Sequence, residues 1–437
     1  MEDTIVSQAT PSGFSAISIV RLSGKKALAF SKALTKKEAP GHKKPILSSI
    51  YIKNNLIDKG MITAFHSPNS YTGEDVVEIA CHGNPNITKS IIEEVISFGG
   101  RLAEPGEYTK RAFLNGKLNL LQAESVGLLI KSKTLEAVER QTRNLSGGIT
   151  EKINEIKESL LSCISVLEFE FDVSDEEYLT KDTMSKITNA LKKCEKNTKK
   201  LNDSFKAGHA YNNGLKISFM GKPNVGKSTL VNKILNLNKS ITSSTPGTTR
   251  DLVLTETVMS GIPITLIDTA GIHKTKNEVE KIGIEKTTEE IHKSDIVVSV
   301  FTKNTQPIDI KGLKNKIMVY NKTDITPYEG KKKGVVAVSA KEGDGVEKLK
   351  ETIIEKTNTT KTDSSEPLIT TIRQRDAIHK LNHHIQLATD NFKDTSPELE
   401  ITALEIRSAI KQIDLFTGKT TTNDILQRVF SDFCVGK

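Results

Sequence analysis

The chain of 437 residues is too long for one hydrophobic core, and at roughly 150 residues per domain it predicts about three domains. No apolar stretch is long enough for a membrane span, and the amino-terminal residues lack a signal sequence. We therefore expect a cytoplasmic protein without stable membrane association. The 62 lysines and arginines exceed the 54 acidic residues, which permits a polyanionic partner such as RNA, although a solvated lysine-rich surface explains the excess equally well.

The first part of the chain, residues 1–117, reads as short strands separated by turns. Alternating apolar and polar residues predict strands at 16–22 and 76–80, with turns at Gly24 and Gly73. This pattern is typical of an α+β domain.

The central part, residues 214–356, alternates strand-like with helical runs. Such an order builds a parallel sheet covered by helices, so we predict an α/β P-loop domain. Its strands are expected at 215–220, 262–267, 296–301, 317–320 and 335–338.

Helical stretches flank this α/β segment on both sides. From 118 to 213, apolar residues recur at steps of three and four, and after a polar linker the same period returns between 357 and 437. We expect the two stretches to form one all-α domain into which the α/β domain is inserted. The predicted fold class is thus multidomain: an α+β domain, a helical domain and an inserted α/β P-loop domain.

A phosphate-binding loop is predicted at Gly221–Ser228, which reads G-x-x-x-x-G-K-S between a strand and a helix. Its glycines let backbone N–H groups close around phosphates. Lys227 is expected to neutralise the β and γ oxygens, and the Ser228 hydroxyl to hold Mg²⁺.

The base is indicated by Asn321-Lys322-Thr323-Asp324, directly after a predicted strand, and by Ser339-Ala340-Lys341 after the next one. A carboxylate can accept from both N1–H and N2–H of guanine, whereas adenine presents a bare acceptor at N1 and would leave a buried carboxylate unpaired. The pattern therefore predicts that the nucleotide bound at this site is GTP.

Two switch segments complete the nucleotide site. Asp268 ends a predicted strand and can reach the Mg²⁺ shell, Gly271 can approach the γ-phosphate, and Thr249 is a candidate Mg²⁺ ligand. The residues expected at GTP are Asn224, Val225, Gly226, Lys227, Ser228, Thr229, Ser243, Ser244, Thr245, Pro246, Gly247, Thr248, Thr249, Asp268, Thr269, Ala270, Gly271, Asn321, Lys322, Asp324, Ser339, Ala340 and Lys341.

Ile272 stands where Ras-like proteins carry the glutamine that orients the attacking water. An isoleucine cannot do this, so catalysis must use another polar group, and Glu278 and Glu280 are the nearby candidates. Arg250 could supply positive charge, although an arginine beside a turn is more often a surface residue. A monovalent cation bound near Asn224 is the alternative source.

Over nearly its full length, the chain resembles the MnmE (TrmE) family of bacterial tRNA-modification GTPases. The resemblance is carried by Asp3–Pro11, Ser70–Asp75, Pro105–Glu107 with Arg111–Lys117, Thr248–Asp251 and Phe433–Lys437. It departs at Ser15-Ala16, where relatives have a glycine-rich pair, and at Val435, where isoleucine is commoner.

The resemblance implies a potassium-dependent GTPase that acts with MnmG on C5 of the wobble uridine of certain tRNAs. It implies aminomethyl or carboxymethylaminomethyl products and a one-carbon donor such as 5-formyl- or 5,10-methylene-tetrahydrofolate. The implied cofactors are GTP, Mg²⁺, K⁺ and this folate. The implied partners are a second copy of the chain in a homodimer, MnmG in a heterotetramer, and tRNA.

The resemblance also implies roles for particular residues. Glu280 would orient the catalytic water, and Cys434 is either a nucleophile or a small buried residue. Mg²⁺ would be held by Ser228 and Thr249; K⁺ by Asn224, Ser243, Thr245 and Thr248; folate by Arg21, Glu78, Lys117 and Lys437. Arg21, Glu78 and Lys117 could instead be ordinary surface charges.

Two other functions remain open on the sequence. Thr-Pro-Gly-Thr-Thr-Arg-Asp at 245–251 also occurs in ribosome-assembly GTPases, whose flanking domains bind rRNA. The chain could also be a folate-binding scaffold whose nucleotide site is merely structural.

Overall fold

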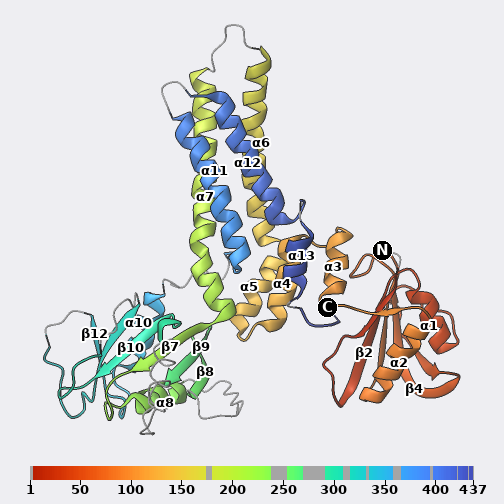
Figure 1. Ribbon diagram of the computed structural model, residues 1–437, viewed down its shortest axis with the longest axis horizontal. Coiled ribbons are helices and arrows are strands. Elements are labelled where there is room, and N and C mark those ends of the chain that lie inside the picture. The colour runs from red at the N-terminus through yellow and green to blue at the C-terminus, as the bar shows by residue number, and fades with distance from the viewer. Residues whose placement is uncertain are drawn as a thin grey trace, which may run out of the picture. The chain divides into compact units, whose positions relative to one another are not determined.

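The computed structural model describes residues 3–173, 180–237, 253–268, 291–308, 315–330, 334–357, 366–393, 397–420, 422–431 and 433–436 (Figure 1). The chain forms two compact units. The first contains residues 1–130, 145–150 and 413–437, and the second contains residues 131–144 and 151–412. In the described parts of the chain, no helix is long and apolar enough to cross a membrane.

The first unit is built on a six-stranded sheet in the order β3-β4-β5-β2-β1-β6. Helices α1 and α2 cover one of its faces, and the core between them includes Val20, Ile50, Ile79, Ile91 and Val95. The elements are β1 (Ile5–Gln8), β2 (Ser15–Ser23), α1 (Ala27–Thr35), β3 (Ile46–Ile52), β4 (Asn55–Phe65), β5 (Val76–Gly83), α2 (Pro85–Ser97), β6 (Arg101–Leu102), α3 (Glu107–Leu114), α4 (Leu120–Lys131) and α13 (Asn423–Ser431).

An ion network around the buried Arg111 holds the residues before β1 to the loop after β4 and to α3. Arg111 is fully buried, and its guanidinium donates to Asp3 Oδ1 at 2.9 Å, Glu74 Oε2 at 3.1 Å and Glu107 Oε1 at 2.9 Å. Arg101 joins the same network through Asp3 and Glu107. Burial acts to raise the pKa of Asp3 and Glu107, but the hydrogen bonds from the arginines outweigh it and hold both pKa values below the usual range.

The carboxyl-terminal helix α13 returns to the first unit. Leu426 and Phe430 pack against Leu120 and Ala123 of α4, together with Phe113 of α3. The chain after α13 then runs beside β1, so closely that a Cβ on Gly436 would come within 2.5 Å of the Gln8 carbonyl oxygen. Packing therefore places Gly436 against the amino-terminal sheet.

The second unit combines long helices with a second six-stranded sheet in the order β12-β11-β10-β7-β9-β8. All neighbouring strands are parallel except the edge pair β8 and β9. Helices α5 and α6 begin the helical part of this unit. The first residues of α6 and the last residues of α12 are assigned to the first unit, and the rest of both helices belongs to the second. The elements are α5 (Leu135–Leu145), α6 (Gly148–Val173), α7 (Lys181–Asn213), β7 (Leu215–Met220), α8 (Lys227–Leu237), β8 (Val253–Met259), β9 (Ile262–Asp268), β10 (Ile296–Phe301), β11 (Lys316–Asn321), β12 (Val335–Val338), α10 (Val346–Lys356), α11 (Ile372–Phe392) and α12 (Leu399–Thr417).

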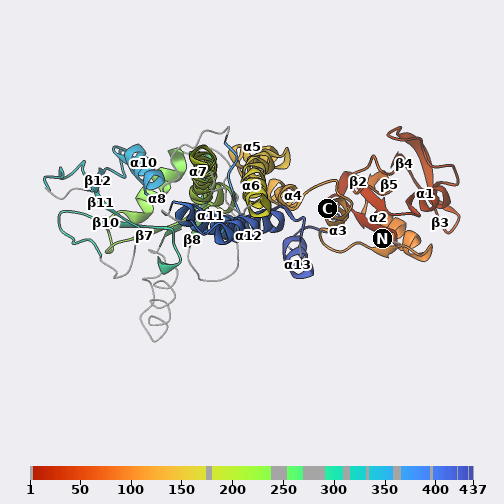
Figure 2. The ribbon, with the colours of Figure 1, turned by 90° about the horizontal axis from the view of Figure 1, so that it is seen from above.

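Helices α7 and α11 lie side by side although the whole α/β sheet separates them in sequence (Figures 1 and 2). Thr198 donates to Asn382 across the pair at 2.7 Å. α11 begins at a capping box, in which Thr371 and Gln374 satisfy each other's backbone N–H groups. The chain thus leaves the helical bundle after α7 and re-enters it before α11, which confirms the predicted insertion of the α/β domain.

Candidate functional site

The predicted phosphate loop lies between β7 and α8, where the strand order places it at the carboxyl edge of the parallel sheet. Asn224 and Gly226 adopt left-handed backbone conformations, with φ of 64° and 90°. A Cβ on Gly226 would come within 2.4 Å of Asn321 Nδ2, so this position requires glycine for both conformation and space. The loop leads into the amino terminus of α8, whose N–H groups suit an anion.

Lys227 is the buried cation of this loop, with only 5% of its surface exposed. Its Nζ donates to the carbonyl oxygens of Gly221 at 2.8 Å and Lys222 at 3.2 Å. Burial lowers the pKa of Lys227, and the nearby Asp268 carboxylate partly opposes this shift. The ammonium group is therefore held in the loop by weak acceptors that phosphate oxygens can replace.

The base motifs are tied to the phosphate loop through Asn321. Its Nδ2 donates to the Val225 carbonyl at 2.8 Å, and its Oδ1 accepts from Ala340 N–H at 2.9 Å. Ser339 donates to Asp324 Oδ1 at 2.8 Å, which fixes one oxygen of that carboxylate. The structure thus brings the phosphate loop and both base motifs together.

The second switch motif, Asp268–Gly271, is described only at its first residue, and the first switch motif lies outside the described residues. Asp268 ends β9, close enough to Lys227 to affect its pKa. Ser228, at the start of α8, is exposed, so its hydroxyl is free to reach a Mg²⁺ ion beside the phosphates. The predicted residues that lie outside the described part of the chain are Ser243, Ser244, Thr245, Pro246, Gly247, Thr248, Thr249, Thr269, Ala270, Gly271, Glu280 and Lys437.

A second polar cluster lies in the first unit, on the sheet face opposite α1 and α2. Arg21 of β2 and Glu78 of β5 stand directly opposite each other, with Arg21 Nη2 2.7 Å from Glu78 Oε1. Arg21 Nη1 also donates to the Gly436 carbonyl at 3.2 Å, and the guanidinium lies 5.6 Å from the centre of the Tyr108 ring. Both charges are partly buried, so neither is an ordinary surface charge.

The other two residues predicted for this cluster are placed differently. Lys117 Nζ donates to the Pro68 carbonyl at 3.0 Å, and no contact joins it to Arg21 or Glu78 among the described residues. Cys434 is exposed, which contradicts the alternative of a small buried residue, and the alternative of a nucleophile stays a prediction. The contributions of Tyr108 and the Gly436 carbonyl were not predicted, because only folding brings these positions to Arg21.

The parallel sheet, the phosphate loop and the base motifs define a P-loop GTPase. Residues 4–117 match the family described as the GTP-binding protein TrmE N-terminus, and residues 120–434 match the MnmE helical domain. Two proteins named tRNA modification GTPase MnmE, from Thermotoga maritima and Aquifex aeolicus, are each 36% identical to this sequence over the whole of both chains. The chain therefore belongs to the MnmE (TrmE) family.

Family membership makes the chain a GTP hydrolase that binds GTP with Mg²⁺. Among solved structures, the G domain of the T. maritima FeoB iron transporter matches 32% of this chain with 98% of its own length, at 23% identity and a TM-score of 0.25. A score this low carries no weight for the fold.

Proposed function

We propose that the chain is a potassium-dependent GTPase that, with MnmG, adds aminomethyl or carboxymethylaminomethyl groups to C5 of the wobble uridine of certain tRNAs. A tetrahydrofolate derivative, 5-formyl or 5,10-methylene, supplies the one-carbon unit. The relatives named above are tRNA modification GTPases. The observation that carries the proposal is that one chain holds both a nucleotide loop and a separate polar cluster built from Arg21, Glu78 and the carboxyl-terminal segment.

The chemistry of the second cluster suits a folate. The Arg21 guanidinium can pair with a carboxylate of the glutamate tail, and Glu78 can accept from the donors of an amino-pyrimidine ring. Lys437 follows Gly436, whose carbonyl already contacts Arg21. Lys117 would also bind the folate if its ammonium group donated to a folate carboxylate in place of the Pro68 carbonyl.

The nucleotide site suits metal-assisted hydrolysis. Ser228 and Thr249 would hold Mg²⁺, which supplies charge neutralisation at the phosphates. K⁺ would lie among Asn224, Ser243, Thr245 and Thr248, and the exposed, left-handed Asn224 projects from the phosphate loop in support of this. Because Ile272 cannot orient water, we assign that role to Glu280.

The open face of the first sheet supports a homodimer. Ile17, Leu47 and Met61 are exposed there, and Leu47 and Met61 are direct cross-strand partners. Phe14, with 86% of its surface exposed, lies between β1 and β2 of the same sheet. Exposed apolar side chains gathered on one sheet face are typical of a protein interface, and a second copy of the chain would cover them.

We propose that the chain is divided into four domain segments. They are the folate-binding and dimerisation domain at 1–117, the first part of the helical domain at 118–213, the GTPase domain at 214–356 and the second part of the helical domain at 357–437, with its terminal Cys-Val-Gly-Lys.

The function is tested by nucleoside analysis of tRNA from cells that lack this protein. We expect the modified wobble uridine to disappear and to return when the unaltered chain is supplied. Unchanged modification in the deletion strain would contradict the proposal. If the strain instead accumulated immature ribosomal particles, the ribosome-assembly alternative would replace it.

A further inference from the structure

Helix α7 carries a dense basic surface. Between positions 192 and 200 it has five lysines and a single glutamate, and every one of these lysines is exposed. The residues of this basic face are Lys192, Lys193, Lys196, Lys199 and Lys200. Leu191, Cys194, Thr198 and Leu201 form the buried side of the same turns. At 3.6 residues per turn, the lysines lie opposite this buried side, so the helix presents them together.

Positive charge exceeds negative charge on the basic face among the described residues, where Glu195 and Asp203 are the acids four residues before and after Lys199. None of its five lysines makes an ion pair there, whereas Lys186, one turn and a half earlier on the same helix, is 2.6 Å from Asp182. Lys192, Lys196 and Lys199 are spaced by four and three residues, so like charges are neighbours on the helix surface. Such spacing destabilises an isolated helix; Glu195 and Asp203, each four residues from Lys199, offset part of this repulsion, and a bound polyanion would relieve the rest.

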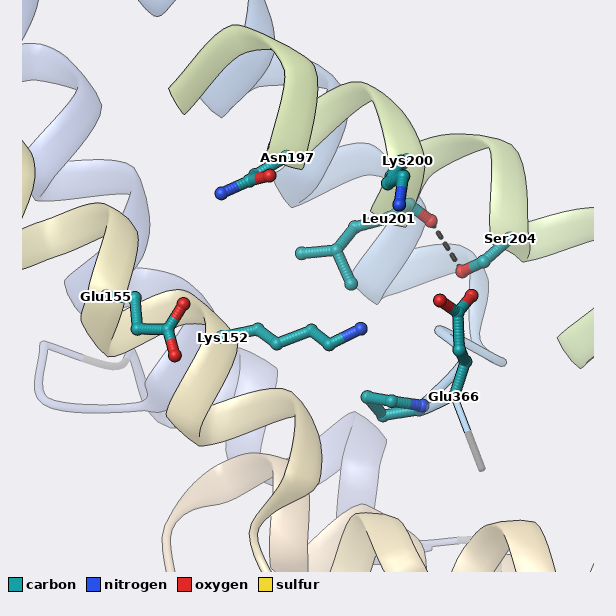
Figure 3. A pocket seen from close by; sticks show the side chains of 8 residues that line it. Lys152, Glu155, Asn197, Lys200, Leu201, Ser204 and Glu366 are labelled. Carbon is teal, nitrogen blue, oxygen red and sulfur yellow. Dashed lines mark hydrogen bonds between the residues drawn. The ribbon is translucent and has the colours of Figure 1, made fainter. Parts of the chain in front are cut away.

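The basic face ends at a small hollow between α6, α7 and the segment before α11 (Figure 3). The hollow has a volume of about 130 Å³, and Lys152 and Lys200 share it with Glu155 and Glu366. Two carboxylates balance two ammonium groups here, so the hollow itself does not favour an anion. The positive field therefore belongs to the exposed face of α7.

We propose that the basic face of α7 binds the sugar–phosphate backbone of the tRNA on which this GTPase acts. The inference rests on the proposed function for its choice of ligand. Eight helical steps span about 12 Å, which is enough to reach several successive phosphates of an RNA strand. Lysine ammonium groups are point charges without a planar fork, and no aromatic side chain lies among them, so this surface positions tRNA without reading its bases.

The surroundings favour RNA over a lipid surface. A helix that lies on a membrane exposes an apolar face beside its lysines. The apolar side of α7 is buried instead, where Leu191 and Leu201 are covered and Thr198 bonds to α11. The neighbouring exposed positions Asn189 and Asp203 are polar.

The test is tRNA binding by the full chain in which Lys192→Gln, Lys196→Gln and Lys199→Gln are combined. Glutamine keeps the helix propensity of lysine and removes only the charge. We expect tRNA affinity at about 0.1 M salt to fall roughly tenfold to a hundredfold, and the slope of log affinity against log salt to become shallower by about 2 to 3. GTP hydrolysis without tRNA should keep its rate, which shows that the variant is folded.

The matched control removes three exposed lysines from the first unit, through Lys25→Gln, Lys43→Gln and Lys44→Gln. It should bind tRNA as the unaltered chain does. An equal loss of tRNA affinity in both variants, or no loss in the α7 variant, would show that the basic face of α7 is not the tRNA-binding surface. Neither outcome would affect the result expected from the deletion strain. Binding of anionic phospholipid vesicles that depends on these α7 lysines, without binding of tRNA, would overturn the proposed surface too.

Discussion

Asp324→Asn should lower the affinity for GTP by roughly a hundredfold to ten-thousandfold. The carboxylate can accept two hydrogen bonds from guanine, each about 1.5–3 kcal/mol when one partner is charged. The asparagine amide has only one acceptor oxygen. Its NH₂ group would face one of the two N–H donors of guanine, and two donors cannot form a hydrogen bond. Since Ser339 holds one carboxylate oxygen, the side chain cannot move aside to escape the mismatch. Equilibrium titration with a fluorescent GTP analogue measures the change.

The control for this experiment is Glu342→Gln, which removes one negative charge from an exposed side chain near the same motif. It should leave GTP affinity nearly unchanged. A xanthine nucleotide, which carries a carbonyl where guanine has N2–H₂, should bind the Asp324→Asn variant better than GTP does. Undiminished GTP affinity in that variant would show that another group reads the base.

Arg111→Met should destabilise the first unit by about 3–5 kcal/mol, because Glu74 loses the one cation that it contacts among the described residues, and Glu107 and Asp3 keep only Arg101. Glu107 is almost fully buried, and Asp3 and Glu74 lose a direct partner as well. Amide hydrogen exchange in β1 and β5 reports the change in this unit without requiring the whole chain to unfold in one step. The neighbouring Lys110→Met, on the same helix, should have little effect.

The loss of stability of the first unit caused by Arg111→Met should depend on pH. In the folded protein the pKa values of Asp3 and Glu107 lie below those of the unfolded chain. The two carboxylates therefore contribute their full share of folding stability above about pH 4 to 5, and this contribution is lost as the pH falls through the pKa values of the folded state. The difference between the variant and the unaltered chain should therefore shrink in acid. A difference that stayed constant down to the lowest pH would contradict an electrostatic cause.

Local patterns were sufficient to predict the parallel strands of the second sheet. The predicted bounds 215–220, 296–301 and 335–338 match β7, β10 and β12, because each is a short apolar run between turn signals. Strand β8 was not predicted. Its sequence, Val-Leu-Thr-Glu-Thr-Val-Met, sets three polar residues between two apolar pairs and lacks a strand alternation, so its place depends on antiparallel pairing with β9.

The long-range contacts of the first unit could not be predicted from the sequence. Arginine is usually exposed, yet Arg111 is fully buried and pairs with three acidic residues. Two of them are distant in sequence, and the third lies on the same helix. Asp3, Glu74, Glu107 and Arg111 all lie in motifs that carry the family resemblance, and the structure gives them a shared structural role. Arg21 and Gly436 are 415 positions apart, so only tertiary packing reveals their contact.

The coupling of GTP hydrolysis to folate-dependent modification is tested most directly by isotope transfer. The purified chain, MnmG, unmodified tRNA and GTP would be incubated with a tetrahydrofolate carrying ¹³C in its one-carbon unit, in K⁺ or in Na⁺ of equal ionic strength. Mass spectrometry then measures the label at C5 of the wobble uridine. We predict labelled product in K⁺ and little in Na⁺; equal labelling in both salts, or modification without ¹³C, would contradict the account.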